Sequence, residues 1–437
     1  MPAEPPTSPT QLLFTDLDGA PRGKLLSAAK LRGALAAGGL GFCDVAFGWD
    51  LGDAPYDGDD GATGWHRGYP DARLCVRETD VRGDGALVVG DFAGGHLEGL
   101  CPRSLLRRVL AEAERMGLRV HGALEYEWVN LTRASVDAGG LPEPATAGMH
   151  GYSVLRPAAA PGYADELWAE LAGLDVPLEG LHTETGPGYY EAAYHYAEGL
   201  ELADRAALLK LGVKRVGLRR GYASTFMAKW RADLPGCGGH FHQSLASLDG
   251  GRPLLAEPGG ADGGLSAAGR HYLAGQLLWL PRLLALYAPT VNSYKRLVPG
   301  SWAPTHVGWG VDNRTVAVRV IPGGSNTRIE LRVPGADANP YLVAAAAVAS
   351  GLYGIAEALP LELPPVGGDA YTAGGELVPL ATNLAAATTA LREHRDAAAD
   401  LLGAEFVDHF LRTRDWEWRR AEAAVTDWER DRYLELV

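Results

Sequence analysis

The residues best suited to chemistry are two glutamates on either side of a Gly-Pro-Gly turn. Glu184 and Glu191 lie in the stretch LHTETGPGYYE, residues 181–191. The turn at 186–188 reverses the chain sharply, because glycine tolerates positive φ and proline fixes φ at about −65°. Two carboxylates that converge across this turn can bind one cation, although two solvated acids on an ordinary loop would share the pattern. We expect Glu191 to open a helical segment.

Two short alternating stretches offer further ligands. In EYE, residues 125–127, the two-residue period of a strand puts both carboxylates on one face. HFH, residues 240–242, places two imidazoles in the same way, directly after the glycine-rich residues 235–239. Taken alone, each stretch is also typical of a half-exposed sheet face or of two surface histidines.

A third stretch, RIELR, combines both charges on one face of a predicted strand. Arg328 and Arg332 flank Glu330 there, which indicates either an ion-pair ladder or a metal ligand between two anion-binding groups. Further arginines lie upstream, at Arg296, Arg314 and Arg319. Arginines beside cation-binding acids are what polyphosphate chemistry requires. The ligand-type side chains together are rich in oxygen and favour Mg²⁺ or Mn²⁺ over zinc: Glu125, Glu127, Glu184, Glu191, Glu330 and His240.

Length and composition indicate a folded chain of two domains. The chain has 437 residues, 47% of them hydrophobic and 22% charged. Its net charge of −14 argues against nucleic acid or an anionic membrane as the main partner. The four cysteines lack CxxC spacing, and the polar N-terminal stretch MPAEPPTSPT is not a signal peptide, so we expect a reducing cytoplasm. The Ala/Gly-rich residues 341–359 predict a buried helix and not a membrane span.

The predicted elements must bring these side chains together. We predict a disordered tail over residues 1–10, a small β-rich domain over 11–101 and a catalytic domain over 102–437. The first domain should contain a hairpin over 11–31 and strands at 74–78 and 86–89. In the second we expect helices at 102–117, 197–212, 265–286 and from 384 onward, and strands at 118–130, 224–229, 239–245, 314–321 and 328–333. Because strands and helices do not alternate regularly, the fold class should be α+β.

In combination, these stretches resemble the glutamine synthetase family of ATP-dependent carboxylate–amine ligases. The resemblance runs from Phe14 to Arg430 through the motifs EYE, HTETGPGYYE, GCGGHFHQSL, RLVPG, DNRTVAVRV and NTRIELRVPGADANPYL. It implies an N-terminal β-grasp domain and a catalytic domain with a curved antiparallel sheet. It also implies ATP with two or more Mg²⁺ or Mn²⁺ ions, and a homo-oligomer of stacked rings, usually a dodecamer, with active sites between neighbours.

The resemblance further implies a role for each matching residue. One metal site, beside the substrate carboxylate, would comprise Glu127, Glu184 and Glu191. A second, at the ATP phosphates, would comprise Glu125, His240 and Glu330. The acid substrate would contact Gly236, Arg296 and Arg332, with Trp302 on the amine side. Glu127, Arg296 and Arg314 would be catalytic, Arg314 by stabilising the transferring phosphoryl group. The nucleotide side would include Glu179, His242, Ser244, Arg319 and Arg328.

Departures from the family pattern point to the substrate. Members that make glutamine carry a glutamate two residues after RLVPG, where it binds and deprotonates ammonium, and this chain has Trp302 there. Asp44 and Asp50 are only candidates for the ammonium-site aspartate, and Pro235 replaces an asparagine that holds the acid substrate. Because an indole offers a π-faced wall to an organic amine, we expect a γ-glutamyl-amine ligase, as in the polyamine and ethanolamine branch. The alternatives are a glutamine synthetase that uses ammonium and a catalytically silent sensor or structural ring protein.

Overall fold

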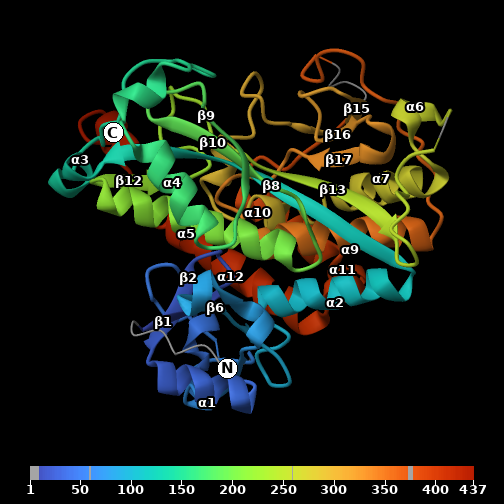
Figure 1. Ribbon diagram of the computed structural model, residues 1–437. Coiled ribbons are helices and arrows are strands. Elements are labelled where there is room, and N and C mark those ends of the chain that lie inside the picture. Colours follow the sequence, from blue (N-terminus) through green and yellow to red (C-terminus); the bar gives the residue numbers. More distant parts are fainter. Residues whose placement is uncertain (1–8, 59–60, 258, 373–376) are drawn as a thin grey trace.

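The computed structural model describes residues 9–58, 61–257, 259–372 and 377–437 (Figure 1). The predicted tail therefore lies almost entirely outside the described residues. The N-terminal strands, blue in Figure 1, pack beneath the helices of a much larger part that contains a long mixed sheet. The predicted α+β class is confirmed.

Two small sheets make up the N-terminal part. The first has the order β2-β1-β6-β5 and the second the order β3-β4-β7. Their strands are β1 (Thr10–Thr15), β2 (Pro21–Leu26), β3 (Leu40–Cys43), β4 (Asp71–Cys75), β5 (Val81–Arg82), β6 (Leu87–Val89) and β7 (Asp91–Phe92). The hairpin prediction is confirmed for β1 and β2, but it extended too far. Helix α1 (Ala28–Ala37) begins at once, because Ser27 caps it by accepting a hydrogen bond from the Lys30 N–H.

A nine-stranded, mainly antiparallel sheet carries the acidic residues. Its order is β15-β16-β17-β13-β8-β10-β9, and β11 and β12 also pair with β8. Its strands are β8 (Leu118–Thr132), β9 (Leu178–Thr183), β10 (Tyr189–Tyr194), β11 (Ala197–Glu198), β12 (Tyr222–Thr225), β13 (Gly239–Ser247), β15 (Trp309–Val311), β16 (Val318–Ile321) and β17 (Arg328–Leu331). A separate pair joins β14 (His306–Val307) to β18 (Val378–Pro379). The long strand β8 therefore sits at the centre and carries the EYE motif.

Helices form much of the rest of this larger part. They are α2 (Pro102–Arg115), α3 (Arg133–Ala138), α4 (Tyr163–Ala172), α5 (Glu201–Arg219), α6 (Ala261–Gly264), α7 (Ala267–Trp279), α8 (Leu284–Tyr287) and α9 (Pro340–Ala356), followed by α10 (Leu384–Glu393), α11 (Arg395–Leu402), α12 (Ala404–Glu422) and α13 (Asp427–Tyr433). Helix α9 is buried almost throughout, as expected. Small residues on both helices let α7 and α9 approach closely. A Cβ on Gly275 of α7 would lie 2.2 Å from the carbonyl oxygen of Ser350 on α9. None of the described helices is long and apolar enough to cross a membrane.

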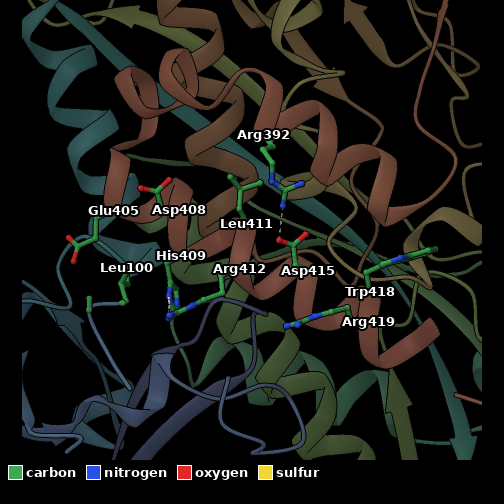
Figure 2. A pocket seen from close by; sticks show the side chains of 12 residues that line it. Leu100, Arg392, Glu405, Asp408, His409, Leu411, Arg412, Asp415, Trp418 and Arg419 are labelled. Atoms are coloured by element: carbon green, nitrogen blue, oxygen red, sulfur yellow. Dashed lines mark hydrogen bonds and ion pairs between the residues drawn. The ribbon is translucent and has the colours of Figure 1, made fainter. Parts of the chain in front are cut away.

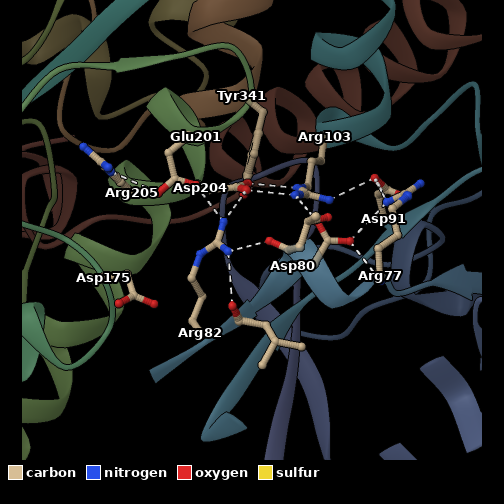
Figure 3. Close-up of polar contacts among 12 residues, drawn as sticks. Arg77, Asp80, Arg82, Asp91, Arg103, Asp175, Glu201, Asp204, Arg205 and Tyr341 are labelled. Carbon is tan, nitrogen blue, oxygen red and sulfur yellow. Dashed lines mark hydrogen bonds and ion pairs between the residues drawn. The ribbon is translucent and has the colours of Figure 1, made fainter. Parts of the chain in front are cut away.

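A buried ionic network joins the N-terminal part to the helices (Figure 3). Arg103 on α2 donates to both carboxylate oxygens of Asp204 on α5, each at 2.8 Å. It also donates to Asp80 at 2.8 Å and to Asp91 at 3.0 Å, both in the N-terminal part. The Tyr341 hydroxyl of α9 donates to Asp204 at 2.8 Å. The predicted boundary between residues 101 and 102 is thus crossed by buried ion pairs, and it stays a prediction.

Several predicted elements differ from the structure, three of them markedly. The helix expected to begin at Glu191 is wrong: this residue lies in β10, whose aromatic and alternating sequence YYEAAY suits a strand between two others. The helix expected over 265–286 is interrupted at Pro281, where proline removes a backbone donor, and so forms α7 and α8. The strand expected from Arg314 begins only at Val318.

Candidate active site

One row of acidic side chains crosses three adjacent strands. Glu127 on β8 pairs with Glu191 on β10, and Glu191 pairs with His182 on β9. Residues directly opposite in an antiparallel sheet project from the same face with Cβ atoms about 5 Å apart. Glu184 follows β9, and its Oε1 lies 3.1 Å from His182 Nε2. Ligand atoms of His182, Glu184 and Glu191 all lie within 4.8 Å of one another, which suits a single cation.

A second group continues on the same face. Glu125 pairs with His240, and His242 pairs with Glu330. His242 Nε2 lies 3.1 Å from Glu125 Oε2, and His240 Nδ1 lies 3.4 Å from Glu330 Oε1. Ligand atoms of Glu125, His242 and Glu330 lie within 4.8 Å of one another. The structure therefore brings both histidines to this group, and His242 completes the tighter set.

The electrostatics of the two groups fit divalent cations. Burial and the neighbouring Glu191 carboxylate raise the pKa of Glu127 to about 7. Burial also raises the pKa of Glu191. Hydrogen bonds to Glu184 and Glu191 raise the pKa of His182 to about 10. Carboxylates held this close need a compensating positive charge, which two divalent ions would supply.

Arginines border the second group. Buried Glu330 accepts a hydrogen bond from Arg319 Nη1 at 3.0 Å and another from Arg332 Nη1. Burial opposes ionisation of Glu330, but His240 and Arg332 outweigh it and lower its pKa to about 2. Arg296 is also buried and donates to the Val333 carbonyl at 2.9 Å, with its Nη2 3.3 Å from His240 Nε2. These contacts fix the guanidiniums beside the acids, where they could receive anionic groups.

Arg314 differs from the other arginines. It lies on the exposed loop between β15 and β16 and forms no ion pair with any residue that the structure describes. Burial and the charges of Glu184, Glu191 and Glu125 raise the pKa of the Tyr152 phenol, and the charge of Arg314 opposes this rise. The exposed guanidinium is therefore not held by any acidic side chain that the structure describes.

A cavity of about 590 Å³ opens beside the second group. Four of the five residues predicted for the nucleotide side line it, together with Glu125: Glu179, His242, Ser244 and Arg328. Arg319 is not among its lining residues and instead pairs with Asp312 and Glu330. The volume lies in the range of small-molecule and cofactor sites. Its lining combines acids that could bind cations with the exposed Arg328, which could contact phosphates.

The glycine-rich loop before β13 packs against the acid-substrate side. Gly238 N–H donates to Glu127 Oε2 at 3.0 Å. A Cβ on Gly236 would lie 2.8 Å from Arg296 Cγ, which explains why glycine is needed there. The Trp302 backbone carbonyl accepts from Arg332 Nη2 at 3.4 Å, and its indole is 68% exposed. Trp302 does not line the 590 Å³ cavity, so the indole lies outside the predicted nucleotide side.

Sequence reasoning missed two residues of the site. His182 could have been found, because it lies two residues before Glu184 and so shares its face on an extended segment. Tyr152 stacks on His182 with ring centroids 4.5 Å apart, but it comes from an irregular loop without a periodic pattern. The two candidate aspartates are engaged elsewhere: Asp44 contacts His96 at 2.9 Å, and Asp50 accepts from Trp416 Nε1 on α12 at 2.8 Å.

A second cavity, of about 700 Å³, lies along α12 (Figure 2). Its charged side chains are largely compensated within the chain. Arg392 pairs with Asp415 at 2.6 Å, and Arg419 pairs with Asp57 at 2.9 Å. None of the acidic-row residues lines it, so it is separate from the candidate active site.

Replacing Gly238 by alanine tests the geometry of the site. The new Cβ would lie 2.7 Å from His240 Nε2 and 3.0 Å from both Arg296 Nη2 and Glu127 Oε1. Because all three groups must shift, we expect Gly238→Ala to lower kcat/KM by about a hundredfold. Gly180→Ala on β9 is the matched control, since its Cβ meets nothing within 4 Å. Steady-state kinetics measure kcat/KM for both variants. Equal values would contradict the placement of Gly238 against Glu127, His240 and Arg296.

Comparisons with known proteins agree with this geometry. A family model described as "Glutamine synthetase, catalytic domain" matches residues 99–433. The chain is 43% identical to the type-1 glutamine synthetase 2 of Dictyostelium discoideum, over 97% of this chain and 83% of that protein. It is 37% identical to a glutamate–isopropylamine ligase of a Pseudomonas species, over 97% and 94%. A solved structure titled GmaS/ADP complex superposes with a TM-score of 0.83 at 29% identity, covering 98% of this chain and 96% of that one.

Proposed function

The chain belongs to the glutamine synthetase family, and on this premise we propose that it joins the γ-carboxylate of glutamate to an organic amine at the expense of ATP. The products are a γ-glutamyl amide, ADP and phosphate. The similarity to a glutamate–isopropylamine ligase and to a structure titled as an ADP complex supports both the reaction class and the nucleotide. A related acid is the alternative to glutamate, since Pro235 replaces the asparagine that holds the acid substrate in the family.

The reaction has two steps. A γ-carboxylate oxygen attacks the terminal phosphorus of ATP, and the bond from that phosphorus to ADP breaks. The amine nitrogen then attacks the acyl carbon of the acyl phosphate, the carbon–oxygen bond to phosphate breaks, and the nitrogen loses a proton. Divalent cations, Mg²⁺ or Mn²⁺, would supply positive charge to the phosphates and the acyl phosphate in both steps.

The chain's own residues have distinct tasks in these steps. Glu127, with Glu184, Glu191 and His182, would hold one cation beside the acid, and the group containing Glu125 and Glu330 would hold the other at the phosphates. Arg296 and Arg332 are fixed beside these acids and would orient the acid substrate. Arg314, which no described carboxylate neutralises, is free to stabilise the phosphoryl group as it transfers.

The presence of Trp302 is the observation that supports an organic amine over ammonium as the substrate. Family members that make glutamine carry a glutamate at this position, and the indole has no charge with which to bind ammonium. Its backbone is held by Arg332 while its ring stays exposed, so an aromatic face is available to the alkyl part or the cation of an amine. An assay of ADP release with ATP, glutamate and a panel of amines tests the proposal, and turnover with ammonium but with none of the organic amines would refute it.

The first alternative is ammonium as the substrate, which the similarity to a type-1 glutamine synthetase favours. A silent sensor or structural ring protein is disfavoured, because all six predicted metal-ligand positions carry ligand-type side chains and the five of them that lie in strands share one face of the sheet. We further propose that the chain works in the cytoplasm as a homo-oligomer of stacked rings, with β-grasp and catalytic domains divided near residue 101.

Replacing Trp302 by glutamate distinguishes the organic amine from ammonium. The new carboxylate would restore a negative charge to the amine side, and it also removes the aromatic wall. We therefore expect Trp302→Glu to lower kcat/KM for the preferred organic amine by about tenfold and to raise that for ammonium. Mass spectrometry of the amide and glutamine products measures both. Trp428→Glu, on the exposed helix α13, is the control, and an unchanged amine preference in Trp302→Glu would contradict the assignment.

A further inference from the structure

A segment after α9 contacts two loops, the one before β14 that carries Trp302 and the one between β15 and β16 that carries Arg314. We call residues 363–372 the strap. The Trp309 indole N–H donates to the Leu363 carbonyl at 2.7 Å, and the Val366 N–H donates to the Trp309 carbonyl at 2.8 Å. In Figure 1 the strap belongs to the orange-red chain near β15. It thus lies along the far edge of the sheet, beside the loop between β15 and β16.

Asn313 ties the strap to the residue next to Arg314. Its side-chain amide donates to the Val366 carbonyl at 3.0 Å and to the Gly368 carbonyl at 2.7 Å. Its side-chain oxygen accepts from the Thr315 N–H at 2.9 Å and from the Thr315 hydroxyl at 2.7 Å. An asparagine side chain has two donor hydrogens and two acceptor lone pairs, and all four are used. The residues on both sides of Arg314 are therefore fixed.

The strap also contacts Thr315, the residue that follows Arg314. The Ala370 N–H donates to the Thr315 hydroxyl oxygen at 3.0 Å, and that hydroxyl lies 3.3 Å from the Gly368 carbonyl. The Arg314 side chain remains exposed and unpaired among the described residues. An exposed guanidinium on a fixed backbone can reach a phosphoryl group from a defined starting position.

Tyr371 connects the strap to the amine side. Its hydroxyl donates to the buried Ala303 carbonyl at 2.9 Å. The preceding residue, Trp302, has a left-handed φ of 59°, which a bulky residue adopts only when its surroundings hold it there. Burial raises the pKa of the Tyr371 phenol, while the nearby Arg332 and Arg296 guanidiniums act in the opposite direction. The Tyr371 hydroxyl therefore holds the backbone directly after Trp302.

We propose that the strap positions Trp302 and Arg314 together, and that Tyr371 is a specificity-determining positioning residue for the amine. Tyr371 acts by holding the strained Trp302 backbone so that the indole faces the incoming amine. Asn313 acts by holding the backbone on which Arg314 meets the phosphoryl group. One segment thereby links the residue that stabilises phosphoryl transfer in the first step to the residue that faces the amine in the second. This inference rests on the proposed amine ligase function.

Two conservative variants separate the two tasks. Tyr371→Phe removes one hydrogen bond, so we expect a roughly fivefold higher KM for the amine and a KM for ATP within about twofold of wild type. Asn313→Asp replaces the amide donor by an oxygen facing two carbonyls, and we expect kcat to fall about tenfold with little change in the KM for the amine. Tyr353→Phe, whose ring packs edge-on against Trp279, is the control. A merely structural role would instead change all the KM values alike.

Hydrogen–deuterium exchange without substrates tests the strap independently of catalysis. We expect backbone exchange to be roughly fivefold faster over residues 300–305 in Tyr371→Phe and over 311–316 in Asn313→Asp. Unchanged exchange in both variants, or equal changes in every KM, would overturn the role of the strap. A wild-type chain that ligates no organic amine would overturn the proposed function, whereas the exchange result would still decide whether the strap holds the loop.

Discussion

Replacing Glu127 by glutamine is expected to lower kcat by about two to three orders of magnitude. Glu127 lies opposite Glu191 on the central strands, and the Gly238 N–H orients it. Glutamine keeps the volume and an oxygen that can accept this hydrogen bond, but it removes the charge that a cation needs. Steady-state ADP release with glutamate and the preferred amine measures the loss.

The same substitution should not destabilise the fold. Burial and Glu191 raise the pKa of Glu127 from 4.5 to about 7, so its ionisation in the metal-free protein opposes folding increasingly as the pH rises from 4.5 to 7. At pH 8, Glu127→Gln should therefore match or exceed the wild-type melting temperature. Glu417→Gln, a partly buried glutamate on α12, is the control for activity. If Glu127→Gln retained half of the wild-type turnover, Glu127 would not be a metal ligand.

Replacing Asp204 by alanine is expected to cost about 3 kcal/mol of the free energy of unfolding. Asp204 is buried and accepts hydrogen bonds from Arg103 and from the Tyr341 hydroxyl. Its removal leaves the buried Arg103 guanidinium with fewer compensating charges, although Asp80 and Asp91 remain in contact. Urea unfolding at pH 7 measures the change. Asp415→Ala is the control: its ion pair with Arg392 is about half exposed, so we expect at most about 1 kcal/mol.

The cost of Asp204→Ala should also depend on pH. Burial opposes ionisation of Asp204, but Arg103 outweighs it and lowers the pKa below its ordinary 3.8. The stabilisation is therefore fully present above the unfolded-state pKa and is lost as the pH falls through the folded-state pKa. The difference between wild type and variant should shrink below pH 4. A difference that stayed constant from pH 7 to pH 3 would show that packing, not the ion pair, is responsible.

Sequence periodicity was sufficient for the centre of the site. The two-residue period of EYE and HFH placed their side chains on one face, and the strand register confirms this for Glu125, Glu127 and His240. The helix at Pro102 and the buried helix α9 also follow from local signals, since proline suits a first helical turn and small residues suit close packing.

Long-range pairing could not be read from the sequence. The segment after Glu191 was predicted to be a helix. Its partner strands, β8 and β9, are distant in the sequence or separated from it by a turn, so they leave no local signal of a strand. The stacking of Tyr152 on His182 and the contact of the strap with Asn313 both join segments separated by irregular chain. Such contacts depend on the fold as a whole, so no local pattern predicts them.

We propose that the two carboxylate groups beside one face of the sheet bind two divalent ions where a triphosphate meets an acid. A crystal structure with Mn²⁺ and a non-hydrolysable ATP analogue, with an anomalous difference map, tests it directly. We predict one manganese peak among His182, Glu184 and Glu191 beside Glu127, and a second among Glu125, Glu330 and the two histidines of β13. Manganese bound elsewhere, or a nucleotide bound with neither peak, would contradict the account.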